Sequence, residues 1–148
     1  MFIGSQFEHV LDAKGRTSIP AKFREVLLSK YDERLILTPD RPGCVRAHPF
    51  LVWTQRLEKF RVLPKTHPAV RAFERVVLGQ AQEVSIDKQG RILVPPQLRA
   101  RAGLKKQILF EGLDDTFMIW DAKSWEAALT EDQEFLSNNP TALSDLGL

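Results

Sequence analysis

Two arginines have the residue context that points most clearly to chemistry, because each directly follows a glycine in a short turn-forming segment. The segments are Asp12–Arg16 (Asp-Ala-Lys-Gly-Arg) and Asp87–Arg91 (Asp-Lys-Gln-Gly-Arg). An aspartate can accept hydrogen bonds from the backbone of its own turn, and a glycine can adopt the positive φ of a tight turn. We therefore predict that Arg16 and Arg91 lie exposed at two hairpin tips. An arginine in such a place can bind guanine in bidentate fashion in the major groove of DNA.

Further basic side chains surround these two arginines. Lysine binds phosphate as a point charge, so lysines beside the turns could hold the DNA backbone while the arginines contact bases. A two-stranded β-ribbon is narrow enough to enter the major groove. The predicted DNA-binding residues, taken from the turns and from the helix starts that follow them, are Arg16, Lys14, Arg91, Lys88, Lys22 and Arg24.

Each motif also has an interpretation that involves folding alone. A single Asp-x-x-Gly-Arg segment is a weak motif, because the arginine could simply form an ion pair with the aspartate across the tip. Two copies strengthen the structural interpretation more than the functional one, since a repeat can also be kept for folding. Both interpretations stay open on these residues alone.

The two turns belong to an internal repeat with an offset of 75 residues. Residues 12–24 align with residues 87–99, and five of the 13 aligned positions are identical. In both copies a strand precedes the turn, a second strand follows it, and a proline then begins a helix, where its missing N–H costs nothing. Arg24 and Arg99 occupy equivalent positions in the two copies. The chain is therefore expected to contain two copies of one strand–turn–strand–helix unit.

Other periodic segments predict the elements around the repeats. Pro49 and Pro68 are expected to start two helices separated by a turn, and Asp121 is expected to cap a third. Gly103 is a predicted helix stop. We expect strands over residues 7–11 and 17–19, short apolar strands at 35–37 and 108–110, and a polar, frayed tail from Thr130 onward.

The composition is that of a globular protein, and it excludes several other classes. The chain has 148 residues, of which 43% are apolar and 27% are charged, and its net charge is +2. No apolar run is long enough to span a membrane. The first six residues lack the basic and apolar regions of a secretion signal, so a cytosolic location is expected. Cys44 is the only cysteine, which excludes a disulfide within the chain.

No group of residues has the spacing of a catalytic or metal site. The three histidines lack ligand spacing, and the glycine-rich motifs that bind phosphates or dinucleotides are absent. We expect His48 and His67 to be ordinary turn residues before prolines, and Cys44 to be a small strand residue. A protein that is not an enzyme is expected, with no catalytic residues, metal, cofactor or small-molecule substrate. The expected core or interface anchors are Trp53, Trp120 and Trp125.

Both turn motifs resemble the paired Asp-x-x-x-Arg signature of the MraZ family of transcriptional regulators. The opening Met1–Gly4 and the segment Arg71–Arg75 are also similar to that family. The resemblance implies an α+β fold: an AbrB-like swapped-hairpin β-barrel made of two internal repeats, with flanking α-helices. The implied organisation is a first AbrB-like repeat at 1–53, a helical connection at 54–79, a second AbrB-like repeat at 80–130 and a flexible C-terminal tail at 131–148.

The same resemblance implies a function. The family's members are bacterial regulators of the division and cell wall gene cluster that bind direct repeats in their own promoter. They act as ring-like homo-oligomers larger than dimers, in the cytoplasm at the nucleoid. Arg16 corresponds to the family's DNA-contact residue, and Lys14 and Arg91 are the next candidates by position. Gln89 stands where the first motif has Lys14, so the two turns are expected to contribute unequally.

Charge is distributed unevenly along the chain and indicates how copies could assemble. Residues 49–78 carry six basic and two acidic side chains, whereas residues 111–134 carry one basic and eight acidic. Head-to-tail contacts between two different surfaces can close into rings. We hypothesise that the basic segment of one subunit contacts the acidic segment of the next. Two alternatives stay open: both segments are solvated faces, or apolar contacts through aromatic side chains dominate.

The main alternative function is a ring-forming scaffold or interaction protein that regulates a partner enzyme without direct DNA readout. The turn arginines would then serve folding only. Replacing Arg16 separates the two hypotheses, because a DNA contact can be lost without loss of fold or assembly.

Overall fold

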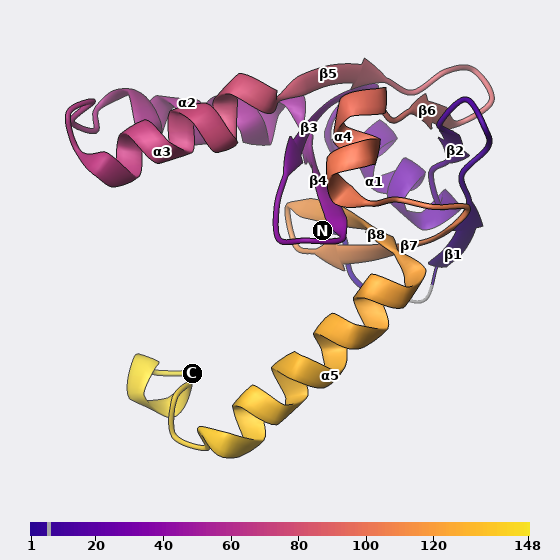
Figure 1. Ribbon diagram of the computed structural model, residues 1–148. Coiled ribbons are helices and arrows are strands. Elements are labelled where there is room, and N and C mark those ends of the chain that lie inside the picture. Colours follow the sequence, from indigo (N-terminus) through magenta and orange to yellow (C-terminus); the bar gives the residue numbers. More distant parts are fainter. Residues whose placement is uncertain (6) are drawn as a thin grey trace.

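The computed structural model shows an α+β protein built on antiparallel strands (Figure 1). It describes residues 1–5 and 7–148; Gln6, which belongs to the predicted first repeat, lies outside this description. The larger sheet has the strand order β1-β7-β8-β4-β3-β5, and β2 pairs with β6 in a separate two-stranded ribbon. The strands are β1 Phe7–Val10, β2 Arg16–Ser18, β3 Arg34–Pro39, β4 Cys44–Pro49, β5 Gln82–Ser85, β6 Arg91–Leu93, β7 Gln107–Leu113 and β8 Thr116–Asp121. The helices are α1 Ala21–Lys30, α2 Phe50–Arg61, α3 Pro68–Val76, α4 Pro96–Ala102 and α5 Ala122–Asn138, with short 3-10 helices η1 Leu78–Gln80 and η2 Ser144–Leu146.

The two halves of the chain are interleaved. Strand β1 pairs with β7, β2 with β6 and β3 with β5, so each of these pairs joins a strand before α2 to a strand after α3. The hairpins β3–β4 and β7–β8 are joined side by side through β4 and β8. Every sheet therefore needs strands from both copies of the repeat.

Prolines set the start of four helices, as the sequence predicts. Pro20, Pro49 and Pro95 hold extended dihedrals directly before α1, α2 and α4, and Pro68 is the first residue of α3. The fixed φ of proline is compatible with a first helical turn, and the residue needs no N–H partner there. At the other end of α4, Gly103 has φ 66° and forms the left-handed cap that the sequence predicts.

The core between the sheets and helices is rich in phenylalanine. Phe23 of α1 contacts Phe2 and Phe117, with ring centroids 5.3 and 5.1 Å away. Leu27, one turn further along α1, is also buried, so Phe23 and Leu27 form the inner face of this helix. Burial of one such side chain contributes roughly 1.5–3 kcal/mol. Helix α1 therefore fixes the position of β2, which directly precedes it.

Helices α2 and α3 form a hairpin that projects away from the sheets (Figure 1). Phe60 and Phe73 pack against each other across the hairpin with centroids 5.0 Å apart. Trp53 is buried at the base of α2, as expected for a core anchor. The β2–β6 ribbon lies on the opposite side of the molecule from this hairpin (Figure 1).

Helix α5 extends from the end of β8 and is held there by polar contacts. The Asp121 side chain accepts a hydrogen bond from the Ser124 backbone N–H at 3.3 Å, which confirms the predicted cap. The Glu111 carboxylate accepts hydrogen bonds from the indole N–H groups of Trp120 and Trp125 at 3.1 and 2.7 Å. Further along, Arg41 donates to Asp132 at 2.8 Å. The helix continues to Asn138, so the first residues of the tail that is expected to be frayed from Thr130 onward are helical.

His48 differs from its sequence-based interpretation. It is not a turn residue: it lies in β4, it is buried, and its Nε2 is 3.0 Å from the Thr38 hydroxyl. Burial lowers the pKa of His48 to about 3, so the ring is neutral. The prediction failed because α2 begins at Phe50 directly after Pro49, the last residue of β4, with no turn between them. Cys44 is a buried strand residue, as predicted, and burial raises the pKa of its thiol to about 12.

Candidate nucleic-acid interface

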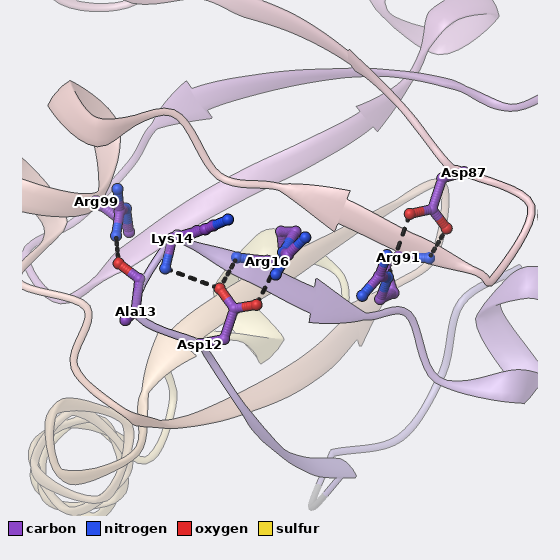
Figure 2. Close-up of polar contacts among 7 residues, drawn as sticks. All are labelled: Asp12, Ala13, Lys14, Arg16, Asp87, Arg91 and Arg99. Atoms are coloured by element: carbon purple, nitrogen blue, oxygen red, sulfur yellow. Dashed lines mark hydrogen bonds and ion pairs between the residues drawn. The ribbon is translucent and has the colours of Figure 1, made fainter.

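The first turn is organised by the carboxylate of Asp12. Its Oδ1 accepts hydrogen bonds from the backbone N–H groups of Lys14 and Arg16 at 2.9 and 2.8 Å. Its Oδ2 accepts from Nε of Arg16 at 2.9 Å (Figure 2). Gly15 has φ 91°, which is why a glycine is needed at this position. The pKa of Asp12 is lowered, first by the hydrogen bond from the Arg16 backbone, so the carboxylate is charged at neutral pH.

The second turn repeats this geometry around Asp87. The Asp87 carboxylate accepts from the backbone N–H groups of Gln89 and Arg91 at 2.8 and 2.9 Å, and from Nε of Arg91 at 3.2 Å. Gly90 has φ 78°. The pKa of Asp87 is lowered too, with the Arg91 backbone hydrogen bond as the main cause. The same five-residue motif thus builds the same bonded turn twice (Figure 2).

Each arginine is oriented by its aspartate through one side-chain nitrogen only. The bonds from Arg16 and Arg91 to the carboxylates use Nε. Within the described part of the chain, the two terminal nitrogens of each guanidinium make no hydrogen bond, and the side chains are 40% and 35% exposed. The ion pair that sequence inspection offers as the folding-only interpretation is present. It leaves the outer edge of each guanidinium available to a ligand.

The β2–β6 ribbon places both arginines on one face. Arg16 lies opposite Leu93 and Arg91 opposite Ser18, with Thr17 and Ile92 paired between them. Thr17 and Ile92 are 3% and 2% exposed, so they point into the protein.

Side chains alternate between the two faces of a strand. The other four residues, Arg16, Ser18, Arg91 and Leu93, therefore share the outward face. From the spacing of strands and residues, the Cα atoms of the two arginines are about 8 Å apart across the ribbon. The structure brings these two predicted residues together.

Two further arginines, one on α1 and one on α4, contact the turns and support them. Arg24 of α1 donates to the Ile19 carbonyl at 3.1 Å and lies against Gly90 of the other turn, where a Cβ would come within 2.6 Å of its Nη1. Arg99 of α4 donates to the Ala13 carbonyl at 3.5 Å and lies equally close to Gly15 (Figure 2). Each helix arginine thus contacts the turn of the opposite repeat. This crossing was not visible in the sequence, although the equivalence of Arg24 and Arg99 was.

The remaining predicted residues are exposed lysines. Lys14 and Lys88 lie within the two turns, and Lys22 lies in the first turn of α1. None of their ammonium groups has a hydrogen-bond partner among residues 1–5 and 7–148. The surface around the two turns is therefore positively charged, because Asp12 and Asp87 are outnumbered by basic groups. No cluster of three His, Cys, Asp or Glu side chains within the described residues is arranged to hold a metal ion.

Sequence reasoning did not assign a role to Ser18 and Leu93. Both lie on the outward face of the ribbon, between the arginines. The period-2 alternation of Arg-Thr-Ser and Arg-Ile-Leu is the signal that places them there. It becomes informative only once the pairing of β2 with β6 is known.

None of the helices described is long and apolar enough to cross a membrane.

Comparisons with known proteins agree on one family. A family model described as "MraZ protein, putative antitoxin-like" matches residues 77–146, which include the second turn. The transcriptional regulator MraZ of Lactiplantibacillus plantarum is 42% identical to this chain over 131 residues, covering 88% of the chain and 89% of that protein. The protein of the same name from Acetivibrio thermocellus is 43% identical over 86% of the chain and 85% of its own length. The one from Leuconostoc mesenteroides is 39% identical over the full length of both. These relatives are named as transcriptional regulators, which is not a class of enzyme. Their identity and coverage show that the chain belongs to the MraZ family.

Proposed function

We propose that this chain is a sequence-specific DNA-binding transcriptional regulator that inserts the outward face of the β2–β6 ribbon into the major groove. The observation that carries the proposal is the pair of arginines on one face of a two-stranded ribbon, each held at Nε by a charged aspartate. A ribbon of this width fits the major groove. An arginine held at Nε still presents both terminal nitrogens, which can bond guanine O6 and N7 together.

The basic residues divide between base and backbone contacts. Arg16 and Arg91 contact bases, with Arg16 as the principal contact. Lys14, Lys88 and Lys22 contact phosphates, for which the flexible ammonium group is suited. Arg24, which also belongs to the proposed DNA-binding set, is tied to the Ile19 carbonyl and acts by supporting the opposite turn.

We assign the interleaved strands to an AbrB-like swapped-hairpin barrel made of two repeats. The pairing of β1 with β7, β2 with β6 and β3 with β5 supports this assignment, because the strands of each repeat are completed by the other. The proposed units are the repeats at 1–53 and 80–130, the helical connection at 54–79 and the tail at 131–148, whose flexible part follows the end of α5 at Asn138.

The proposed targets are direct repeats in the protein's own promoter, at the division and cell wall gene cluster, and the proposed location is the cytoplasm at the nucleoid. One ribbon offers few phosphate contacts, and each contact adds roughly 0.9 to the salt dependence of binding. A single subunit would therefore bind weakly at physiological salt. A ring-like homo-oligomer that engages several repeats at once raises the effective concentration and gains affinity without new contacts.

The test is a gel-shift with the DNA upstream of the protein's own coding sequence, at two stated salt concentrations. Arg16→Ala is expected to weaken specific binding about 5- to 150-fold, because one bidentate base contact discriminates by roughly 1–3 kcal/mol. Arg101→Ala, which removes the same charge from an exposed site on α4, is the control and is expected to have a small effect.

Gel filtration of the same variants separates DNA contact from assembly. Under the proposal, Arg16→Ala elutes as the wild type does. If wild-type protein binds no DNA from its own upstream region, or if Arg16→Ala disrupts folding and assembly together, the scaffold alternative is favoured instead.

A further inference from the structure

The two ends of the ribbon differ in one position on the outward face. Leu93 lies directly opposite Arg16, whereas Ser18 lies directly opposite Arg91. Ser18 and Leu93 are equivalent in the internal repeat, since their numbers differ by the offset of 75. The approximate two-fold symmetry of the ribbon is therefore broken at the residue that neighbours each arginine.

The environment of Leu93 is unusual for a leucine. It is 48% exposed, on a three-residue strand whose central residue, Ile92, is buried. Its nearest neighbours on the outward face are two arginines, Arg16 directly opposite and Arg91 two residues earlier on the same strand. Single exposed leucines are common and need no explanation. A leucine in the middle of a charged face that is aimed at DNA has a specific chemical counterpart, because thymine presents an apolar methyl group in the major groove.

The distance between side chains that face each other across the ribbon allows the two of them to contact adjacent bases. Side chains directly opposite each other on an antiparallel pair have Cβ atoms about 4.5–5.5 Å apart. Successive bases along one DNA strand are about 3.4 Å apart. A leucine opposite Arg16 can therefore reach a base next to the guanine that Arg16 contacts.

We infer that Leu93 contacts the C5-methyl group of a thymine adjacent to the guanine bound by Arg16, and that this contact gives the ribbon one orientation on DNA. The inference rests on the proposed function. At the other end Ser18, which can bond to more than one base, gives Arg91 a neighbour without this preference. A symmetric ribbon would bind equally in both directions. The broken symmetry selects one direction, which is the property that a site made of direct repeats requires.

The first experiment is selection of binding sites from a random duplex library. Wild-type protein is expected to enrich an asymmetric motif with thymine beside a guanine at one end. Leu93→Ser is expected to lose the thymine preference and enrich a more symmetric motif. The double exchange Ser18→Leu with Leu93→Ser is expected to move the thymine preference to the opposite end. Circular dichroism of each variant checks that it is folded.

The second experiment removes only the methyl group, by replacing the selected thymine with deoxyuridine. Burial of one such group contributes about 0.8 kcal/mol, so wild-type affinity is expected to fall about fourfold. The affinity of Leu93→Ser is expected to be unchanged by the same replacement. This comparison needs only one folded variant, so it stays decisive even where the double exchange fails to fold.

Two results would overturn the inference, and they differ in what they leave standing. If deoxyuridine has no effect on the wild type while Arg16→Ala still weakens specific binding, the thymine contact is wrong and the proposed function survives. If the wild type enriches no motif from the library, the proposed function fails together with the inference.

Discussion

Asp12 and Asp87 each act on an arginine in two ways at once. One carboxylate oxygen accepts the backbone N–H of the arginine and the other accepts its Nε, so the same side chain fixes both the turn and the direction of the guanidinium. Hydrogen bonds to a charged acceptor are stronger than neutral ones. An arginine that is already ordered in the free protein would lose less entropy on binding the proposed DNA.

The glycine in each turn is required by both conformation and space. In Gly15→Ala the new methyl group would lie 2.7 Å from Cζ of Arg99 and 2.9 Å from the Val94 carbonyl oxygen, at φ 91°. We expect a loss of about 2–4 kcal/mol in the free energy of unfolding, from backbone strain and overpacking together. Urea unfolding monitored by tryptophan fluorescence measures it.

Gly103→Ala is the matched control for this prediction. Gly103 also has a positive φ, of 66°, but nothing lies within 4 Å of its Cβ position. It should therefore show only the strain, about 1–2 kcal/mol. Equal losses in the two variants would show that the close approach of Arg99 does not constrain the first turn.

Much of the candidate site follows from residue types, and the rest depends on pairing. The turns, their aspartates and the exposed arginines are local features, so Asp12–Arg16 and Asp87–Arg91 predict them directly. The crossing of Arg24 and Arg99 to opposite turns and the outward position of Leu93 depend on which strand pairs with which. Residues far apart in sequence set that pairing, and a one-residue change of register would turn Leu93 inward.

At the level of elements, the prolines make the helix starts predictable and the strand ends less so. The predicted strand at residues 17–19 is observed at Arg16–Ser18, one residue earlier, because the ladder with β6 begins with Arg16 opposite Leu93 and ends with Ser18 opposite Arg91. His48 was misplaced for a related reason, since a helix can begin directly after a strand. Local signals identify these elements well, and their exact ends are decided by hydrogen bonds to distant residues.

Helix α5 depends on its N-cap residue, Asp121 at the end of β8, for its attachment. Asp121→Ala removes an acceptor for both the backbone N–H and the hydroxyl of Ser124, which donate at 3.3 and 3.2 Å. We expect a loss of about 1 kcal/mol in the free energy of unfolding. Asp121→Asn keeps an acceptor oxygen and is expected to retain most of that stability. Urea titration of both variants provides the comparison, and equal losses would mean that the acceptor oxygen kept by asparagine is not the source of the cap's stability.

At the level of the whole molecule, the ribbon and the helical hairpin occupy opposite sides (Figure 1). The hairpin carries most of the basic excess of residues 49–78, and α5 carries much of the acidic excess of residues 111–134. Asp132 is partly neutralised by Arg41 within the same chain. The proposed head-to-tail ring would bring hairpin and α5 of neighbouring subunits together while leaving every ribbon free to meet DNA.

Charge reversal on the hairpin tests this assembly. Arg71→Glu with Arg75→Glu changes two exposed positions on α3 and is expected to shift gel filtration toward smaller species, more so at low salt. Lys105→Glu with Lys106→Glu makes the same change in net charge at exposed positions outside the hairpin, and should leave the size unchanged. An oligomer that is indifferent both to these changes and to ionic strength would point to apolar contacts instead.

The interleaving of the halves has a consequence during synthesis. Residues 16–18 leave the ribosome long before residues 91–93, yet among the strands that the structure describes, each strand of the ribbon pairs only with the other. Contacts of such long separation form late and slow the folding of a chain. A polypeptide that stops before residue 91 therefore lacks the surface that is proposed to enter the groove, and an incomplete product of translation could not compete with the finished protein for the proposed DNA site.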